Sequence, residues 1–71
     1  MLVNNIQENI RRPRPLSWVM DFTNLSKQSI YRLMAENDFP RQINLGARKV
    51  AWLESEVRAW LDHRIEASKA S

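Results

Sequence analysis

Apolar residues recur with helical spacing in three separate stretches of the chain. Within each stretch they return after three or four positions, so a helix would carry them along one side. The pattern predicts a short helix in "LSWVMDFT", a second between Ser26 and Asn37, and a third in "ESEVRAWLDHRIEAS". The three apolar faces consist of Leu16, Val19, Met20 and Phe22; of Ile30, Leu33 and Met34; and of Val57, Trp60, Leu61 and Ile65.

Polar residues with strong turn and cap preferences flank the first two helices. Ser17 is suited to cap the first helix, and Asn24 tolerates the left-handed backbone that a tight turn requires. Ser26 is a favoured N-cap for the second helix. Asn37 can end that helix, and Pro40 prevents its simple continuation. Two short helices joined in this way form a helix-turn-helix.

In the segment "RQINLGARKVAWL" the apolar residues recur at every second position instead of every third or fourth. Ile43 alternates with Leu45, and Val50 alternates with Trp52. Between these pairs lies "GARK", which contains Gly46, the one glycine of the chain. The pattern predicts a β-hairpin with a basic tip. The order helix, turn, helix, hairpin, helix is that of a winged helix-turn-helix, mostly α with a small β-hairpin.

The predicted winged helix-turn-helix domain occupies residues 16–66, with a polar segment on each side. Residues 1–15 end in "RRPRP", and Pro13 and Pro15 bias the residues before them toward extended backbone. This segment is predicted to be a flexible basic arm, with a plain disordered terminus as the alternative. Residues 67–71 are predicted to form a disordered tail.

The positive charge is concentrated in the first three quarters of the chain. The net charge is +3 and the sequence pI is about 10. Basic and acidic side chains number three and one in residues 1–15, five and three in residues 16–53, and three and four in residues 54–71. An acidic partner such as nucleic acid is therefore expected to dock on the first two segments.

Composition also limits the environment of the chain. There is no cysteine, which excludes a disulfide framework and a thiolate metal site and is compatible with a reducing cytosol. No apolar run approaches the roughly 20 residues of a membrane span, and the N-terminus lacks the layout of a signal peptide. The expected location is cytoplasmic and nucleoid-associated, without a membrane partner.

Enzymatic and metal chemistry find no support in the sequence. His63 is the one histidine, and a solvent-facing side chain is the simplest interpretation of it. Glu54 and Glu56 do not share a helix face, whereas Glu54 and Arg58 are spaced for an ion pair on the outside of the last helix. No nucleophile elbow or glycine-rich phosphate loop occurs. We therefore expect no enzyme, no cofactor and no metal.

The exposed side of the second helix offers many hydrogen-bond donors. The second helix of a helix-turn-helix lies in the DNA major groove, where glutamine pairs with adenine and lysine or arginine with guanine. Hydroxyl groups can contact phosphate or base. The alternative is a solvated helix face without function. The predicted reading surface consists of Lys27, Gln28, Ser29, Tyr31 and Arg32.

Basic residues outside this helix favour the DNA interpretation. Arg48 and Lys49 at the hairpin tip can reach phosphates beside a helix in the groove, and Arg41 could add a further contact. Basic arms can enter a minor groove. The candidate contacts of the arm are Arg11, Arg12 and Arg14.

Four motifs in order resemble the AlpA family of small prophage and genomic-island regulators, part of the excisionase and MerR-like winged-helix group. The motifs are "LSKQSIYRLM", "FP" at Phe39–Pro40, "LGARKVAW" and "EVRAWL". The resemblance covers about residues 16–66 and implies site-directed binding to double-stranded DNA. By position it implies a recognition segment from Ser26 to Arg32 and a wing from Gly46 to Lys49.

The resemblance also implies a biological role. Members of the family regulate transcription of integrase genes or act as excisionases, which bend attachment-site DNA and favour excision in recombination. Integrase and neighbouring copies of the chain on repeated DNA elements are further expected partners. An alternative of another class is an adaptor that keeps the winged-helix fold and contacts integrase or a repressor without reading DNA.

The chain departs from the family pattern at four positions. Asn24 and Asn37 stand where the family often has glycine, and both can adopt the turn conformation. Asn44 stands where a basic residue is common. Trp18 stands where a polar residue is usual. An exposed Trp18 would be a protein contact, whereas a Trp18 folded under the N-terminal arm would be structural.

Overall fold

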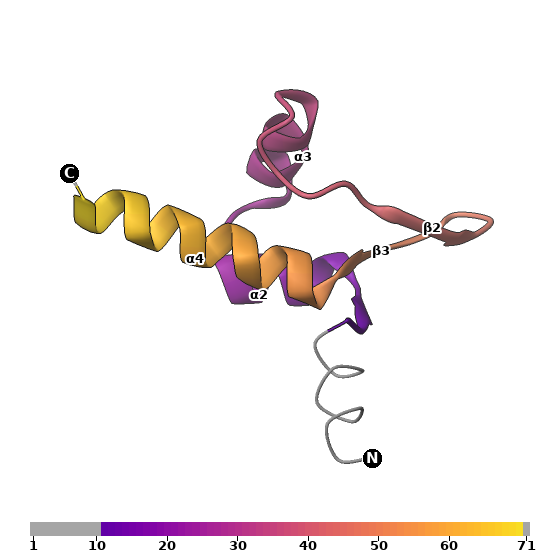
Figure 1. The fold of residues 1–71 in the computed structure, drawn as a ribbon. Coiled ribbons are helices and arrows are strands. Elements are labelled where there is room, and N and C mark those ends of the chain that lie inside the picture. The colour runs from indigo at the N-terminus through magenta and orange to yellow at the C-terminus, as the bar shows by residue number, and fades with distance from the viewer. Residues whose placement is uncertain (1–10, 71) are drawn as a thin grey trace, which may run out of the picture.

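The computed structural model describes residues 11–70 and has the predicted winged helix-turn-helix fold. Three helices and a small antiparallel β-hairpin follow the predicted order, with one additional short strand before the first helix. Figure 1 shows α3 standing above α2 and α4, with the β2–β3 hairpin projecting to one side. The elements are β1 (Pro13–Arg14), α2 (Leu16–Thr23), α3 (Lys27–Ala35), β2 (Ile43–Gly46), β3 (Lys49–Leu53) and α4 (Glu54–Ala70).

The predicted turn residues hold the helix-turn-helix. Asn24 ends α2 in the left-handed conformation, with φ 61° and ψ 28°. The Ser26 hydroxyl caps α3 by accepting the Ser29 backbone N–H at 3.1 Å. Asn37, with φ 59°, follows α3, and its N–H donates to the Met34 carbonyl at 3.0 Å. These three local predictions are confirmed.

The N-terminal cap of α2 differs from the prediction. The helix begins at Leu16, and Pro15 occupies the N-cap position without a side-chain hydrogen bond. Ser17 therefore lies inside the first turn rather than at the cap. The fixed φ of proline, −75° at Pro15, already suits the entry into a helix, so α2 starts earlier than a serine cap would allow.

The hairpin and β1 form an antiparallel three-stranded sheet in the order β1-β3-β2. Ile43 pairs with Ala51 across the hairpin, so the predicted hairpin is confirmed, although Leu45 is exposed. On the other edge of β3, Pro13 pairs with Leu53, and the Glu54 N–H donates to the Arg12 carbonyl at 2.9 Å.

The short strand β1 changes the description of the predicted arm. Of the residues predicted to be flexible, 13 and 14 pair with β3, and residues 1–10 lie outside the described part of the chain. Two prolines favour the extended backbone of a strand, and a residue without an N–H is tolerated at a sheet edge. The predicted flexible arm is therefore wrong for Pro13 and Arg14.

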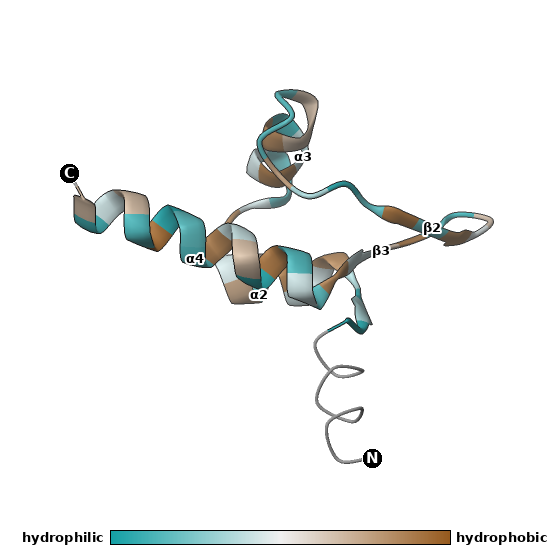
Figure 2. Ribbon diagram, in the orientation of Figure 1, coloured by the Kyte–Doolittle hydropathy of each residue, from teal (hydrophilic) through white to brown (hydrophobic). Residues whose placement is uncertain are grey.

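The core gathers around Trp52, which is 0% exposed at the centre of the sheet. The apolar segments, brown in Figure 2, occur in each of α2, α3, β3 and α4. Their buried side chains meet in one cluster, as expected for a single small domain. The cluster consists of Val19, Ile30, Leu33, Phe39, Trp52 and Val57.

The last helix is longer than predicted. α4 continues to Ala70, whereas the sequence predicted a disordered tail from residue 67. The segment "ASKA" contains strong helix formers and neither glycine nor proline, so nothing stops the helix there. The apolar stripe is shorter than the helix, since Leu61 is half-buried but Ile65 is 42% exposed.

Candidate nucleic-acid interface

The first two turns of α3 present three polar side chains to solvent. Lys27, Gln28 and Arg32 are exposed, and within residues 11–70 none of them takes part in a side-chain hydrogen bond or ion pair. The cap at Ser26 fixes the start of the helix, so the backbone that carries them is well defined. These three side chains are therefore available to an external ligand.

The other predicted residues of this segment also have structural tasks. The Ser26 hydroxyl, besides accepting the Ser29 N–H, donates to the Ser29 hydroxyl at 3.0 Å. Tyr31 is 37% exposed and contacts Trp52 edge-on, with ring centroids 6.3 Å apart. Tyr31 thus packs against the core while part of its ring faces solvent.

The hairpin tip has a constrained backbone and exposed basic side chains. Arg48 and Lys49 are exposed, and Arg48 adopts a left-handed φ of 61°. Gly46 has a φ of 149°, and no atom lies within 4 Å of the position a Cβ would take. Glycine is therefore needed at this position for its backbone conformation and not for space.

Asn44 has a role that sequence reasoning missed. Its side-chain oxygen accepts the Gly46 N–H at 3.0 Å, at the irregular register between Asn44 and Gly46. The side chain of asparagine commonly accepts a hydrogen bond from the backbone N–H of the second residue after it. The Asn-x-Gly spacing in the sequence was therefore the signal for this contact. The residue shapes the base of the tip instead of supplying charge.

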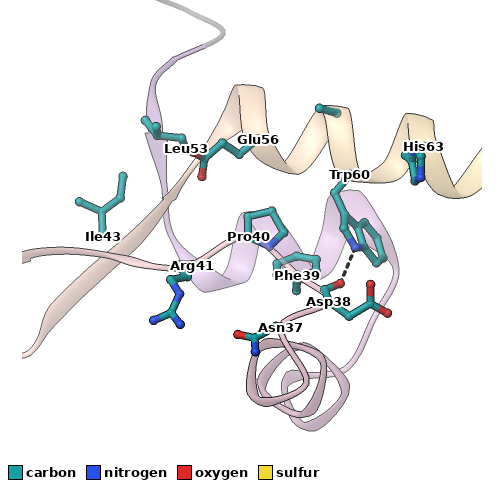
Figure 3. A pocket seen from close by; sticks show the side chains of 11 residues that line it. Asn37, Asp38, Phe39, Pro40, Arg41, Ile43, Leu53, Glu56, Trp60 and His63 are labelled. Carbon is teal, nitrogen blue, oxygen red and sulfur yellow. Dashed lines mark hydrogen bonds between the residues drawn. The ribbon is translucent and has the colours of Figure 1, made fainter.

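Arg41 lies in the loop between α3 and the hairpin and is exposed. In Figure 3 its side chain points away from the neighbouring Phe39, Pro40 and Trp60. The predicted basic contacts thus come from three consecutive parts of the fold, namely α3, this loop and the hairpin tip.

Comparison with known proteins agrees with this arrangement. Residues 12–65 match the family model described as "Prophage CP4-57 regulatory protein (AlpA)", so the match extends from the approach to β1 into α4. The chain belongs to the AlpA family. The description of this family is that of a prophage regulatory protein.

A phage relative supports the assignment to the AlpA family. The chain is 47% identical over 51 residues to a protein of Enterobacteria phage P4 named "Uncharacterized protein ORF88". The aligned region covers 72% of this chain and 58% of the phage protein. The chain therefore spans less than two thirds of the length of that relative.

In this AlpA-family chain, the strand β1 is held to the start of α4 by the buried carboxylate of Glu54. Glu54 is only 4% exposed, and its two oxygens accept hydrogen bonds from the Nε atoms of Arg14 and Arg58, each at 2.7 Å. The predicted pair with Arg58 exists and Arg58 is exposed as predicted, but Glu54 is buried, with Arg14 of β1 bonded to it.

The two arginines determine the charge state of Glu54. Burial alone would raise the pKa of the carboxyl group, but the hydrogen bonds from Arg58 and Arg14 outweigh burial and hold the pKa below its ordinary value. Glu54 is therefore ionised in the folded protein at neutral pH. Arg14, half-buried in this ion pair, differs from the freely exposed arm residue that the sequence suggested.

The same two arginines lie against a pair of stacked rings. Trp18 and Phe22 are parallel, with centroids 4.8 Å apart and an interplanar angle of 8°. The Arg14 guanidinium lies 5.2 Å from the Trp18 ring centre, and the Arg58 guanidinium 5.2 Å from that of Phe22. Trp18 is thus half-buried under the N-terminal segment, which is the structural one of its two predicted alternatives.

Trp60 holds the loop after α3 against α4, a contact that sequence reasoning missed. Its indole N–H donates to the Asp38 carbonyl at 2.7 Å, and its ring meets Phe39 edge-on at 4.8 Å (Figure 3). Arg64 covers the other side of Trp60 at 4.9 Å and bonds the Asp38 carboxylate at 3.1 Å. These contacts position the C-terminal end of α3.

Neither metal chemistry nor a membrane span is indicated between residues 11 and 70. In that range no group of three or more histidine, cysteine or acidic side chains is placed to hold a metal ion. His63 is exposed on α4, at the rim of an open groove of about 820 Å³ beside Trp60. In the same range no helix is both long and apolar enough to cross a bilayer.

Proposed function

We propose that this AlpA-family chain binds double-stranded DNA sequence-specifically, with α3 in the major groove and the hairpin tip on the phosphate backbone. The observation that supports this most directly is the set of three exposed side chains of α3 that have no partner within residues 11–70: Lys27 and Gln28 in the capped first turn, and Arg32 in the last turn. A solvated helix face needs no such concentration of donors.

The dimensions and chemistry of α3 fit base reading. A helix with its side chains is about 10–12 Å in diameter, which fits the ~12 Å width of the major groove. Gln28 is proposed to bond an adenine edge, and Lys27 and Arg32 to bond guanine or phosphate. The hydroxyl groups of Ser26, Ser29 and Tyr31 add contacts to phosphate where their internal bonds allow.

The hairpin tip and the preceding loop supply sequence-independent affinity. Arg41 in the loop after α3, and Arg48 and Lys49 at the tip of the projecting hairpin (Figure 1), are exposed cations, and each neutralised phosphate releases counterions. We assign these three residues to phosphate contacts that orient α3 in the groove.

We further propose that the protein acts at an integrase gene or attachment site, as a transcriptional regulator, an excisionase or both. Bending of the bound DNA would serve these roles together, because a bend brings distant sites close to each other. Contact with integrase and self-association on repeated elements belong to the same proposal. The half-burial of Trp18 beneath the Arg14 guanidinium supports the DNA-binding proposal over the adaptor alternative, which used an exposed Trp18.

Replacing Gln28 with alanine is expected to relax base preference at one position by about 1–3 kcal/mol. The side chain is exposed and has no partner inside residues 11–70, so folding stability should not change. Competition binding with duplexes that vary one base pair at a time measures the effect. Gln42→Ala, which removes an exposed glutamine of the loop, serves as the control; an unchanged preference in Gln28→Ala means that Gln28 does not read a base.

Replacing Arg48 with asparagine is expected to weaken binding to all duplexes alike and to reduce the salt slope of log K by about 1. Asparagine tolerates the left-handed φ of 61°, so the hairpin keeps its shape while the charge is lost. Titrations at several salt concentrations test this, with Lys69→Ala at the far end of α4 as the control. A loss restricted to one DNA sequence would instead make Arg48 a base reader.

A further inference from the structure

A second group of arginines lies around β1 and the first two turns of α4. β1, indigo in Figure 1, lies below the junction of β3 and α4, whereas α3 stands above α2 and α4. Figure 3, from another direction, also places α3 and the N-terminal side of the chain at opposite ends of the view. We define the arginine face as Arg11, Arg12, Arg14 and Arg58.

Two of these four arginines pair with Glu54, and Arg11 and Arg12 directly precede β1. Its side chain joins Arg14 and Arg58, and its backbone N–H bonds the Arg12 carbonyl. Within residues 11–70 the four arginines share one paired carboxylate, which is an excess of three positive charges. Asp21 of α2 forms no salt bridge with any of them in the described part of the chain.

The guanidinium groups of Arg14 and Arg58 are fixed in position and keep their terminal nitrogens free of Glu54. Glu54 occupies only the Nε atoms of Arg14 and Arg58, and the rings of Trp18 and Phe22 support the two groups from one side. Both side chains keep contact with solvent, at 29% and 51% exposure. A stacked guanidinium loses less entropy on binding, and its terminal nitrogens match the geometry of phosphate.

The chemistry of this face suits a polyanion better than a folded protein. Stable protein interfaces have an apolar, aromatic centre, but here the arginines cover Trp18 and Phe22. A DNA segment lying on α3 would be separated from this face by α2 and α4 (Figure 1). The regularly spaced phosphates of another DNA segment match the guanidinium groups of the arginine face.

We propose that the arginine face binds the phosphate backbone of a second DNA segment, so that one chain can join two duplexes. The inference rests on the proposed function for the first segment, which α3 and the hairpin tip hold. The second contact is independent of sequence and sensitive to salt, because it involves phosphates alone. Such a bridge would bring two separated sites of one DNA molecule together.

The test uses the full chain, a short duplex that carries its preferred site and a second short duplex of unrelated sequence. Native mass spectrometry is expected to detect complexes of one chain with both duplexes. The variant Arg11→Ala/Arg12→Ala removes two exposed cations but leaves the Glu54 pairs intact. It is expected to weaken the second contact tenfold or more and to leave affinity for the preferred site unchanged. Arg32→Ala should do the reverse.

Each of the other outcomes contradicts the proposal that one chain joins two duplexes, and each points to a different explanation. A wild-type chain that binds its preferred site but never a second duplex contradicts the inference and leaves the proposed function standing. Complexes of two chains with two duplexes would indicate self-association instead. Equal loss of preferred-site affinity in Arg11→Ala/Arg12→Ala would place the arm on the first duplex. Preference for a polyglutamate peptide over the second duplex would assign the face to an acidic protein, and a wild-type chain that binds no duplex overturns both proposals.

Discussion

Glu54→Ala is expected to lower the free energy of unfolding by about 2–3 kcal/mol. The carboxylate is 4% exposed and accepts two hydrogen bonds of 2.7 Å. Removing one member of a buried ion pair costs about 3–5 kcal/mol, because its partner is left uncompensated. Arg14 and Arg58 retain some solvent contact, which places the loss at or below the lower end of that range.

Urea denaturation measures this difference, and Glu56→Ala is the matched control. Glu56 occupies the same first turn of α4 but is exposed and forms no ion pair within residues 11–70. Its removal should cost less than about 1 kcal/mol, the size of a charge–dipole interaction. Equal losses in the two variants would show that the Glu54 pairs contribute nothing beyond the helix terminus.

The same ion pairs make folding stability depend on acid pH. The pKa of Glu54 lies below its ordinary value of 4.5 in the folded state, so folding favours the ionised form. This contribution is complete above the ordinary pKa and is lost as the pH falls through the lower, folded value. In Glu54→Gln the corresponding component of the stability–pH curve should be absent.

Trp52→Ala is expected to cost about 3–5 kcal/mol, the largest effect of a single substitution in the core. Trp52 is 0% exposed, lies on the central strand opposite Arg14, and contacts Tyr31 of α3. A domain of this size has a total stability of roughly 4–10 kcal/mol. The variant should therefore be partly or wholly unfolded at room temperature.

Trp52→Phe tests whether the core needs the full indole ring or only an aromatic ring at this position. The buried Nε1 of Trp52 has no hydrogen-bond partner among the described residues, so phenylalanine removes no hydrogen bond within residues 11–70. It also keeps an aromatic ring for Tyr31. The expected loss is about 1–2 kcal/mol in urea denaturation. A loss as large as that of Trp52→Ala would mean that the indole shape itself specifies the core.

Local features of the fold could be predicted from sequence because each depends on a few neighbouring residues. Asn24 and Asn37 adopt the left-handed backbone, and Ser26 caps α3, as short-range preferences indicate. The hairpin follows from alternation around Gly46. The exposed residues of α3 were likewise deduced from one helical face.

The features that escaped prediction depend on contacts between distant parts of the chain. Glu54 is buried because Arg14, forty positions earlier, returns to it in β1. The Trp60 contact with Asp38 spans twenty-two positions. Neither spacing leaves a periodic pattern in the sequence. The end of α4 was misplaced for another reason, since the helix runs past the core that defined its apolar stripe.

Selection of bound duplexes from a random DNA pool, at moderate salt, tests the central claim most directly. The proposed reading surface of α3 predicts that the wild-type chain enriches a short motif and that Gln28→Ala enriches a motif relaxed at one position. Retention of DNA without enrichment would reduce the interaction to phosphate attraction. No retention of DNA at all would contradict the proposed function.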